Sequence, residues 1–272
     1  MADSYFSAQW NSSQQGLIVP VKSATVYAAM EQSLFLGGEL IPVVNAPNGV
    51  LQVPELAEVT ASSLAGGTIT TDVSNTVPTD TKNTITADLI AARSVIRDLG
   101  NVDPAEIGRM LGLAVAKKFD QSVYTALDGA TASTTDSEPL TIDAIFDAVQ
   151  QIRGQGEQGQ LFSVVTPAGA TAILKEIGTA AYAGSDTFQA EALRRGLIGS
   201  LAGVQFFVSS YISTANTTGY IFGKDALRIA MQKNVDLEVG RRIEAVGVDC
   251  VASLHAAVGM IDATRAVKLI NV

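Results

Sequence analysis

Near the end of the chain, apolar and polar residues alternate over a long stretch. In GVDCVASLHAAVGMI, residues 247–261, the even positions from Val248 to Met260 are all apolar, whereas Asp249, Ser253 and His255 occupy odd positions. Because successive side chains of a strand point to opposite faces, this alternation predicts one long strand with one face on the core. Apolar, β-branched and aromatic runs predict further strands at residues 161–165, 204–208, 220–222, 235–239 and 266–270.

A helical period appears in the middle of the chain. Asp103 is the expected N-cap, Pro104 lies in the first turn and Gly129 ends the run, so the pattern predicts a rod of about 25 residues and roughly 37 Å. Gly112 marks either a close packing point or a place where the rod bends. The apolar stripe that we expect to face the core consists of Ile107, Met110, Leu111, Ala114, Phe119, Val123 and Leu127.

Shorter elements follow a linker, TASTTDSEP, at residues 131–139. Thr141 is the expected cap of a helix that ends at Gly154. A strand at Leu161–Val165 comes next, and Thr166 and Pro167 open another helix that runs through Ile177. These residues therefore predict a compact α/β unit.

The stretch GLIGSLAGVQFFVSS, residues 196–210, contains three glycines and raises the question of a phosphate-binding loop. In a dinucleotide fold such glycines follow a strand and open a helix. Here the order is reversed, because a predicted helix ending in Arg194 and Arg195 precedes them and a predicted strand follows. No Lys-Ser or Lys-Thr pair follows either. We interpret the stretch as a turn into a strand.

Residues 1–32 are rich in Ser, Gln and Asn, with Tyr5, Phe6 and Trp10 as their main bulky side chains. This composition is too polar to form a core by itself. We expect an arm that docks through Trp10 on a neighbouring subunit; docking on its own subunit is the alternative.

Residues 49–85 are rich in Thr and Ser and contain a Gly66-Gly67 turn signal, which predicts a long two-stranded hairpin. An isolated hairpin is marginal in water. Ordering about 40 residues costs on the order of 40–80 kcal/mol of backbone entropy. The hairpin's own hydrogen bonds offset part of this entropy cost. If apolar burial offset the remainder, it would have to cover up to roughly 1,600–3,200 Å² of surface. Because this area is typical of an obligate interface, we expect the hairpin to lie on another subunit.

The composition indicates that other protein covers much of the surface of this chain. Of the 272 residues 47% are hydrophobic and 17% are charged, against roughly 25% charged residues in ordinary soluble proteins. No apolar run approaches the ~18 residues of a membrane helix, and the N-terminus does not match a signal peptide. A surface this poor in charge favours an obligate oligomer.

The inventory of reactive side chains argues against an enzyme or a metalloprotein. The single histidine, His255, excludes sites with several histidines, and the single cysteine, Cys250, excludes an internal disulfide and any CxxC motif. The net charge of −9 argues against tight binding to nucleic acid, which depends on clustered Lys and Arg. We therefore expect no catalytic, metal-binding or cofactor-binding residues.

Taken in order, the segments resemble the major capsid proteins of tailed bacteriophages, the class Caudoviricetes, with the Hong Kong 97 fold. The resemblance covers nearly the whole chain, and its weight comes from the order and spacing of the elements rather than from one motif. The stretches that carry it are Asp103–Gly129, Gly196–Ser210, GYIFGKDALRIA at residues 219–230 and the final residues 247–272.

The resemblance implies an α+β fold with an N-terminal arm, an extended β-hairpin loop, a long spine helix in a peripheral domain and an α/β axial domain. The implied divisions are the arm at 1–32, a lead-in to the peripheral domain at 33–48, the extended hairpin loop at 49–85, the peripheral domain at 86–140 with its spine helix at 103–129, the axial domain at 141–215, and return strands, mainly of the peripheral domain, at 216–272.

It also implies self-assembly into hexamers and pentamers of an icosahedral shell, in a virion assembled in the host cytoplasm, around packaged double-stranded DNA that is contacted weakly and non-specifically. Many members of the family expand during capsid maturation. Because the chain enters the arm directly after Met1, we expect a separate scaffolding protein, beside a portal and a cement or decoration protein. Lys82 is the only lysine of the hairpin, which disfavours covalent cross-linking between subunits. No membrane contact is expected.

The contacts between subunits are expected at residues of the arm, the hairpin, the turn region and the charged end of a late strand. They are Trp10, Leu64, Lys82, Arg194, Arg195, Glu238, Arg241 and Arg242. Two other functions stay open at this point. An encapsulin-like compartment that houses an enzyme uses the same fold, and an oligomeric α/β enzyme is the more distant alternative.

Overall fold

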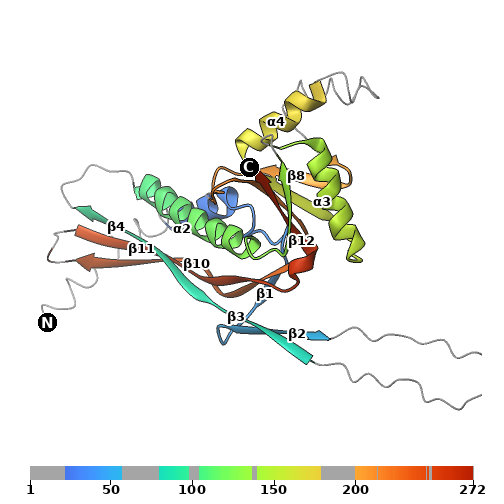
Figure 1. Cartoon of the computed structure of the whole chain (residues 1–272). Coiled ribbons are helices and arrows are strands. Elements are labelled where there is room, and N and C mark those ends of the chain that lie inside the picture. Colours follow the sequence, from blue (N-terminus) through green and yellow to red (C-terminus); the bar gives the residue numbers. More distant parts are fainter. Residues whose placement is uncertain are drawn as a thin grey trace, which may run out of the picture.

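The computed structural model describes residues 22–56, 80–97, 104–136, 140–178, 200–212, 214–242, 244 and 247–271. The strands form three sheets with the orders β1-β10-β11-β4, β5-β12-β9-β6-β8-β7 and β2-β3. In Figure 1 the helix α2 lies along the four-stranded sheet, α3 and α4 lie beside the six-stranded sheet, and the β2-β3 ribbon projects away from both. The molecule thus consists of two cored regions and one protrusion.

The four-stranded sheet is built on two long antiparallel strands, β10 (Leu227–Arg242) and β11 (Gly247–Met260). The strand predicted through Met260 is confirmed, since Cys250, Ala252 and Leu254 of its apolar face are fully buried. The strand predicted at residues 235–239 is only the middle of β10. Two further strands, which the sequence analysis did not predict, complete the sheet: β4 (Asp88–Arg97) beside β11 and β1 (Val43–Asn45) beside β10.

The predicted long helix is confirmed as α2 (Pro104–Leu127), whereas its expected cap, Asp103, lies outside the described residues. Five members of the predicted stripe are buried: Ile107, Leu111, Phe119, Val123 and Leu127. The prediction was wrong for Met110, which is 63% exposed, and for Ala114, which is also exposed. Both residues have the helical spacing of the stripe, but the rest of the subunit covers a narrower face of α2 than the pattern indicated.

Gly112 is a close packing point. Residues 22–32 form a helix that crosses α2 here, and a Cβ atom at Gly112 would lie 2.3 Å from the carbonyl oxygen of Thr25. Ala28 and Ala29 are buried at the same crossing. The part of the predicted arm that the structure describes therefore packs on its own subunit. Residues 1–21, including Trp10, lie outside the described residues.

The six-stranded sheet has a fully buried centre. Every residue of β6 (Leu161–Val165) and β9 (Thr217–Gly223) is buried. Beside them lie β8 (Val204–Val208), β7 (Ser200–Leu201), β12 (Ala266–Asn271) and β5 (Ala132–Asp136). Residues 132–136 were expected in a linker, and this was wrong, because they pair in parallel with β12. The sheet thus takes three strands, β5, β9 and β12, from outside residues 141–215.

The helices of this region follow the sequence signals closely. Thr141 caps α3 (Ile142–Gly154) by accepting a hydrogen bond from the backbone N–H of Ala144, as predicted. The helix α4 (Pro167–Gly178) begins at the predicted proline. The turn interpretation of residues 196–210 is confirmed where the structure describes it: Ala202 and Gly203 both have positive φ and join β7 to β8. The helix expected to end at Arg194 and Arg195 lies outside the described residues.

The predicted hairpin is confirmed at its base. The strands β2 (Val50–Leu56) and β3 (Asp80–Thr86) pair antiparallel over their whole length, whereas residues 57–79, with the expected Gly66-Gly67 turn, lie outside the described residues. After Ala87 the chain enters β4, so the ribbon is joined directly to the four-stranded sheet (Figure 1). Ile85 is buried against Gly259 of β11, where a Cβ atom would lie 2.4 Å away. This contact anchors the ribbon.

Candidate assembly surface

A polar cluster joins the end of α2 to the six-stranded sheet. Asp128 accepts hydrogen bonds from Lys268 Nζ at 2.6 Å, from Tyr220 Oη at 2.9 Å and from Thr214 Oγ1 at 2.7 Å. Burial alone would raise the pKa of Asp128, but these hydrogen bonds and the ammonium charge hold that pKa below its usual value. The ionised carboxylate thus ties the end of α2 to β9 and β12.

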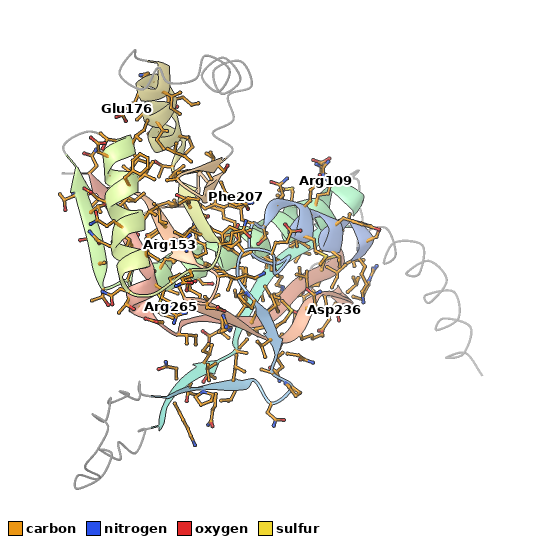
Figure 2. All side chains as sticks on the ribbon, turned by 90° about the vertical axis from the view of Figure 1, so that its right-hand side faces the viewer. Arg109, Arg153, Glu176, Phe207, Asp236 and Arg265 are labelled. Carbon is orange, nitrogen blue, oxygen red and sulfur yellow. The ribbon has the colours of Figure 1, made fainter. Side chains whose placement is uncertain are left out.

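A second ion pair holds the opposite end of the six-stranded sheet. Glu157 is buried and accepts hydrogen bonds from Arg265 Nη1 at 3.0 Å and from the backbone N–H of Gly159 at 2.7 Å. Arg153 Nη1 donates to the carbonyl oxygens of Glu157 and Gly159, each at 2.9 Å. Figure 2 shows Arg153 and Arg265 close together on this side of the molecule. The loop after α3 is thereby tied to the turn that precedes β12.

The helix of residues 22–32 ends at a buried acid. Asp120 of α2 is buried and accepts a hydrogen bond from Ser33 Oγ at 2.6 Å and a longer one from the backbone N–H of Leu34 at 3.4 Å. Burial raises the pKa of Asp120 to about 6, although both hydrogen bonds oppose this shift. The acid thus holds the turn at residues 33–36 on α2 and is costly to ionise.

Charged side chains form a short network on the outer part of β10. Asp236 pairs with Lys22 at 2.6 Å and with Lys233 at 3.0 Å, and Lys233 also lies 3.8 Å from Glu238. Hydrogen bonds from Lys22 and Lys233 lower the pKa of Asp236 to about 2. Figure 2 places Asp236 on the same side of the molecule as Arg109 of α2, away from Arg153. The network links the start of the 22–32 helix to the sheet.

Large apolar side chains are exposed at several separate places of the described surface. The sequence analysis did not single them out as surface residues, because hydrophobic side chains in helices and strands give the same signal whether a core or another subunit covers them. Exposure in the folded subunit is the signal that identifies them. They are Tyr27, Met30, Val43, Val50, Leu89, Met110, Phe146 and Val208.

The predicted contact residues divide into two groups. Four lie outside the described residues: Trp10, Leu64, Arg194 and Arg195. The other four lie on strands: Lys82 on β3, and Glu238, Arg241 and Arg242 at the outer end of β10. Lys82, Glu238 and Arg241 are exposed. The fold thus places Lys82 on the protruding ribbon and the other three together on a different sheet, so that the four do not form one site.

No three His, Cys, Asp or Glu side chains in the part of the chain that the structure describes are grouped to hold a metal ion. His255 lies half-buried on β11, opposite Leu89 in the strand register, and Cys250 is buried. In the same described ranges, no helix has the length and apolarity needed to cross a membrane.

Comparisons with known proteins identify relatives of this arrangement. The family model described as phage capsid protein matches residues 105–269. The sequence matches none of the curated proteins compared with it. Among solved structures, the capsid of Cyanophage P-SCSP1u is similar over 87% of this chain and 88% of that chain, with a TM-score of 0.69 and 17% identity.

Two further structures are similar over most of their length. The mature capsid of bacteriophage PhiM1 matches over 89% of this chain and 88% of that chain, with a TM-score of 0.66 and 16% identity. A virus-like particle from Pyrococcus furiosus matches over 93% of this chain and 98% of that chain, with a TM-score of 0.64 and 13% identity. The predicted Hong Kong 97-like fold class is confirmed.

Proposed function

Because the chain belongs to the phage capsid protein family and is a major capsid protein, we propose that its copies assemble into hexamers and pentamers of a closed icosahedral shell around packaged double-stranded DNA. The shell is the wall of the virion and is assembled in the host cytoplasm. The role of the chain in it is structural rather than catalytic.

The observation that carries this proposal is the β2-β3 ribbon. It is a two-stranded sheet that projects from the cored regions (Figure 1), and Val50 on it is 43% exposed. An isolated two-stranded ribbon is marginally stable in water, whereas a ribbon that lies across a neighbouring copy gains the missing burial.

The net charge of −9 supports a loose relation between the shell and its contents. A wall of acidic subunits repels the phosphate backbone, so that packaged DNA does not adhere to it. A separate scaffolding protein directs assembly, a portal occupies one opening and a cement or decoration protein holds the finished shell.

Electron microscopy of the purified protein tests the proposal. We expect closed shells with five-fold and six-fold clusters of subunits, and nucleic acid inside particles recovered from infected cells. Enzyme cargo inside the particles would instead identify an encapsulin-like compartment. Small oligomers under all assembly conditions, with the scaffolding protein supplied, would contradict a shell function of any kind.

A further inference from the structure

The base of the β2-β3 ribbon is tied to the four-stranded sheet by backbone hydrogen bonds that lie close together. The N–H of Ala46 donates to the carbonyl oxygen of Met231 on β10 at 2.9 Å, and the N–H of Ala87 donates to the carbonyl oxygen of Gly49 at 2.7 Å. Gly49 has positive φ and lies in the turn before β2. Because these bonds all lie at one end of the ribbon, they attach it but do not prevent it from tilting about that end.

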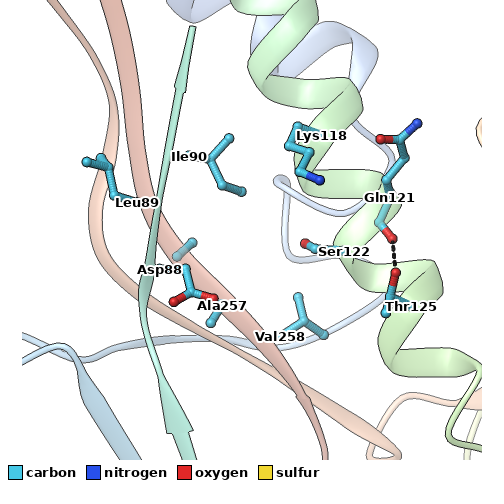
Figure 3. A pocket seen from close by; sticks show the side chains of 10 residues that line it. Asp88, Leu89, Ile90, Lys118, Gln121, Ser122, Thr125, Ala257 and Val258 are labelled. Atoms are coloured by element: carbon cyan, nitrogen blue, oxygen red, sulfur yellow. Dashed lines mark hydrogen bonds between the residues drawn. The ribbon is translucent and has the colours of Figure 1, made fainter.

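The subunit also leaves space beside this joint. A groove of about 730 Å³ lies between the start of β4 and α2. Asp88, the first residue of β4, and Val258 of β11 both line it. Figure 3 shows the strand on one side of the groove and, on the facing side of the helix, Lys118, Gln121, Ser122 and Thr125. The start of β4 therefore has open space on the side of α2.

Ile85 of β3 is the side chain that opposes tilting. It is 6% exposed and lies among small residues of the sheet, Ala46, Ala230 and Ala257. Gly259 faces it, and a Cβ atom at Gly259 would lie 2.4 Å from Cγ1 and 2.6 Å from Cδ1 of Ile85. We call these four small residues the Ile85 socket. One large side chain thus fits a space that exists only because its neighbours are alanine and glycine.

A second contact holds the same face of β3 farther from the joint. Asn83 Nδ2 donates a hydrogen bond to the carbonyl oxygen of Ile261 at 3.1 Å. Since side chains of a strand alternate, Asn83 and Ile85 point to the same side, whereas Lys82 and Thr84 are exposed on the other. The ribbon is therefore held on one face at two points beyond the backbone bonds of its base, and such points fix its angle to the sheet.

We infer that Ile85 in its socket sets the direction in which the ribbon leaves the subunit, and that copies assemble only when this direction is kept. The inference rests on the proposed function, in which the ribbon lies across a neighbouring copy. Ile85 is then a positioning residue and not only a core residue. Because isoleucine is β-branched and stiff at χ1, a change in the socket moves the strand and not just the side chain.

Gly259→Ala tests the inference, because its methyl group would overlap Ile85. Carbon atoms in contact stand about 3.5–4.0 Å apart, so β3 must move away by about 1 Å. The double variant Gly259→Ala with Ile85→Ala removes the overlap, since the two Cβ atoms would lie 3.5 Å apart. The matched control is Gly240→Ala on β10, where a Cβ atom would meet nothing within 4 Å.

The direction of the ribbon is measured as the distance between spin labels at Lys82→Cys on β3 and Thr125→Cys on α2. Both positions are exposed, and the native Cys250 is fully buried. Labelled chains are kept unassembled and diluted with unlabelled chains, so that only distances within one chain contribute. We expect Gly259→Ala to shift the mean distance by about 1 Å or more, Ile85→Ala alone to broaden the distribution, and the double variant and Gly240→Ala to keep the original mean.

Electron microscopy of the same variants without labels measures assembly. We expect Gly259→Ala to lose most closed shells and the double variant to recover them. Identical distance distributions for Gly259→Ala and Gly240→Ala would overturn the inference, as would a shifted ribbon that still builds normal shells. If Gly259→Ala does not fold, Ile85→Ala decides, and an unbroadened distribution overturns the inference. Absent shells in every chain, the wild type included, refute the proposed function, whereas the distances in unassembled chains still decide whether Ile85 sets the direction of the ribbon.

Discussion

The centre of the six-stranded sheet and the β2-β3 ribbon are both made of short strands, yet they solve the problem of burial differently. Every residue of β6 and β9 is buried between neighbouring strands and helices of the same chain. On the ribbon, by contrast, Val50 is 43% exposed, and the main anchor to the rest of the subunit is Ile85 at its base. One region is complete within a single chain, whereas the proposed function has a neighbouring copy complete the other.

The difference teaches where the free energy of each region comes from. Burial of apolar side chains contributes about 25 cal/mol per Å², and a strand buried on both faces gains it on folding. A ribbon whose other face stays open gains less of it until another surface covers that face. Damage to the first region should therefore unfold the subunit, and damage to the second should leave the subunit folded but unable to assemble.

Removal of the protrusion should have the largest effect. Replacing residues 57–79 by a short Gly-Ser linker should leave β2 and β3 paired, so that the subunit keeps its fold, but it removes the segment that the proposed function places on a neighbouring copy. We expect loss of closed shells in electron micrographs and an unchanged circular dichroism spectrum. As a control, the same linker inserted between Gly66 and Gly67 should still permit shells. Normal shells from the replaced chain would contradict this picture of the ribbon.

Truncation in the buried sheet should come next. Phe222 of β9 is fully buried, so Phe222→Ala should lower the free energy of unfolding by about 3–5 kcal/mol, as other large-to-small changes in cores do. Denaturant unfolding of the unassembled chain measures this loss. The matched change on the ribbon, Val50→Ala, should alter the same quantity by less than about 0.5 kcal/mol. Similar losses for both variants would remove the distinction between the regions.

The buried acid should make the subunit more stable at mildly acidic pH. The pKa of Asp120 is about 6 in the folded chain and 3.8 in the unfolded reference state. Between pH 3.8 and pH 6 the folded chain therefore binds a proton at Asp120 that the unfolded chain has lost. Stability from this group is therefore fully present below about pH 4 and is lost as the pH rises through 6. The pKa difference corresponds to about 3 kcal/mol.

Asp120→Asn isolates this contribution. We expect the difference in unfolding free energy between the wild type and Asp120→Asn to change by about 2–3 kcal/mol from pH 4 to pH 7.5, with the wild type gaining as the pH falls. Tyr124, which interacts with Asp120, keeps its proton throughout this range, because its ordinary pKa is 10.0 and burial raises that pKa further. A difference between the two chains that is independent of pH would show that Asp120 does not titrate there.

The smallest effect should come from the exposed charges of β10. Glu238 is an exposed residue whose carboxylate lies 3.8 Å from Lys233, so Glu238→Gln should change the unfolding free energy by less than about 0.5 kcal/mol. Its buried counterpart, Glu157→Gln, weakens the pair with Arg265 and should cost about 1–3 kcal/mol. If Glu238→Gln leaves stability unchanged but slows shell assembly, the predicted contact role of Glu238 gains support.

The sequence by itself determined the elements that local signals define. A capping threonine and a terminal glycine mark α3, a proline in the first turn marks α4, and alternation marks β11, because these patterns follow from backbone geometry alone. They placed Thr141, Pro167 and the apolar face of β11 correctly. They also defined the order of elements from which the fold class was inferred.

Only the tertiary structure decided which apolar positions are covered and which polar segments become strands. Residues 132–136 form β5 because β12 supplies hydrogen-bond partners from the far end of the chain, and no local signal announces such a partner. Met110 has the spacing of a core residue and is nevertheless exposed, because the covering elements do not reach it. The edge of β4 likewise appears only when strands are ordered in space, since being at the edge is a property of the sheet and not of the residues in the strand.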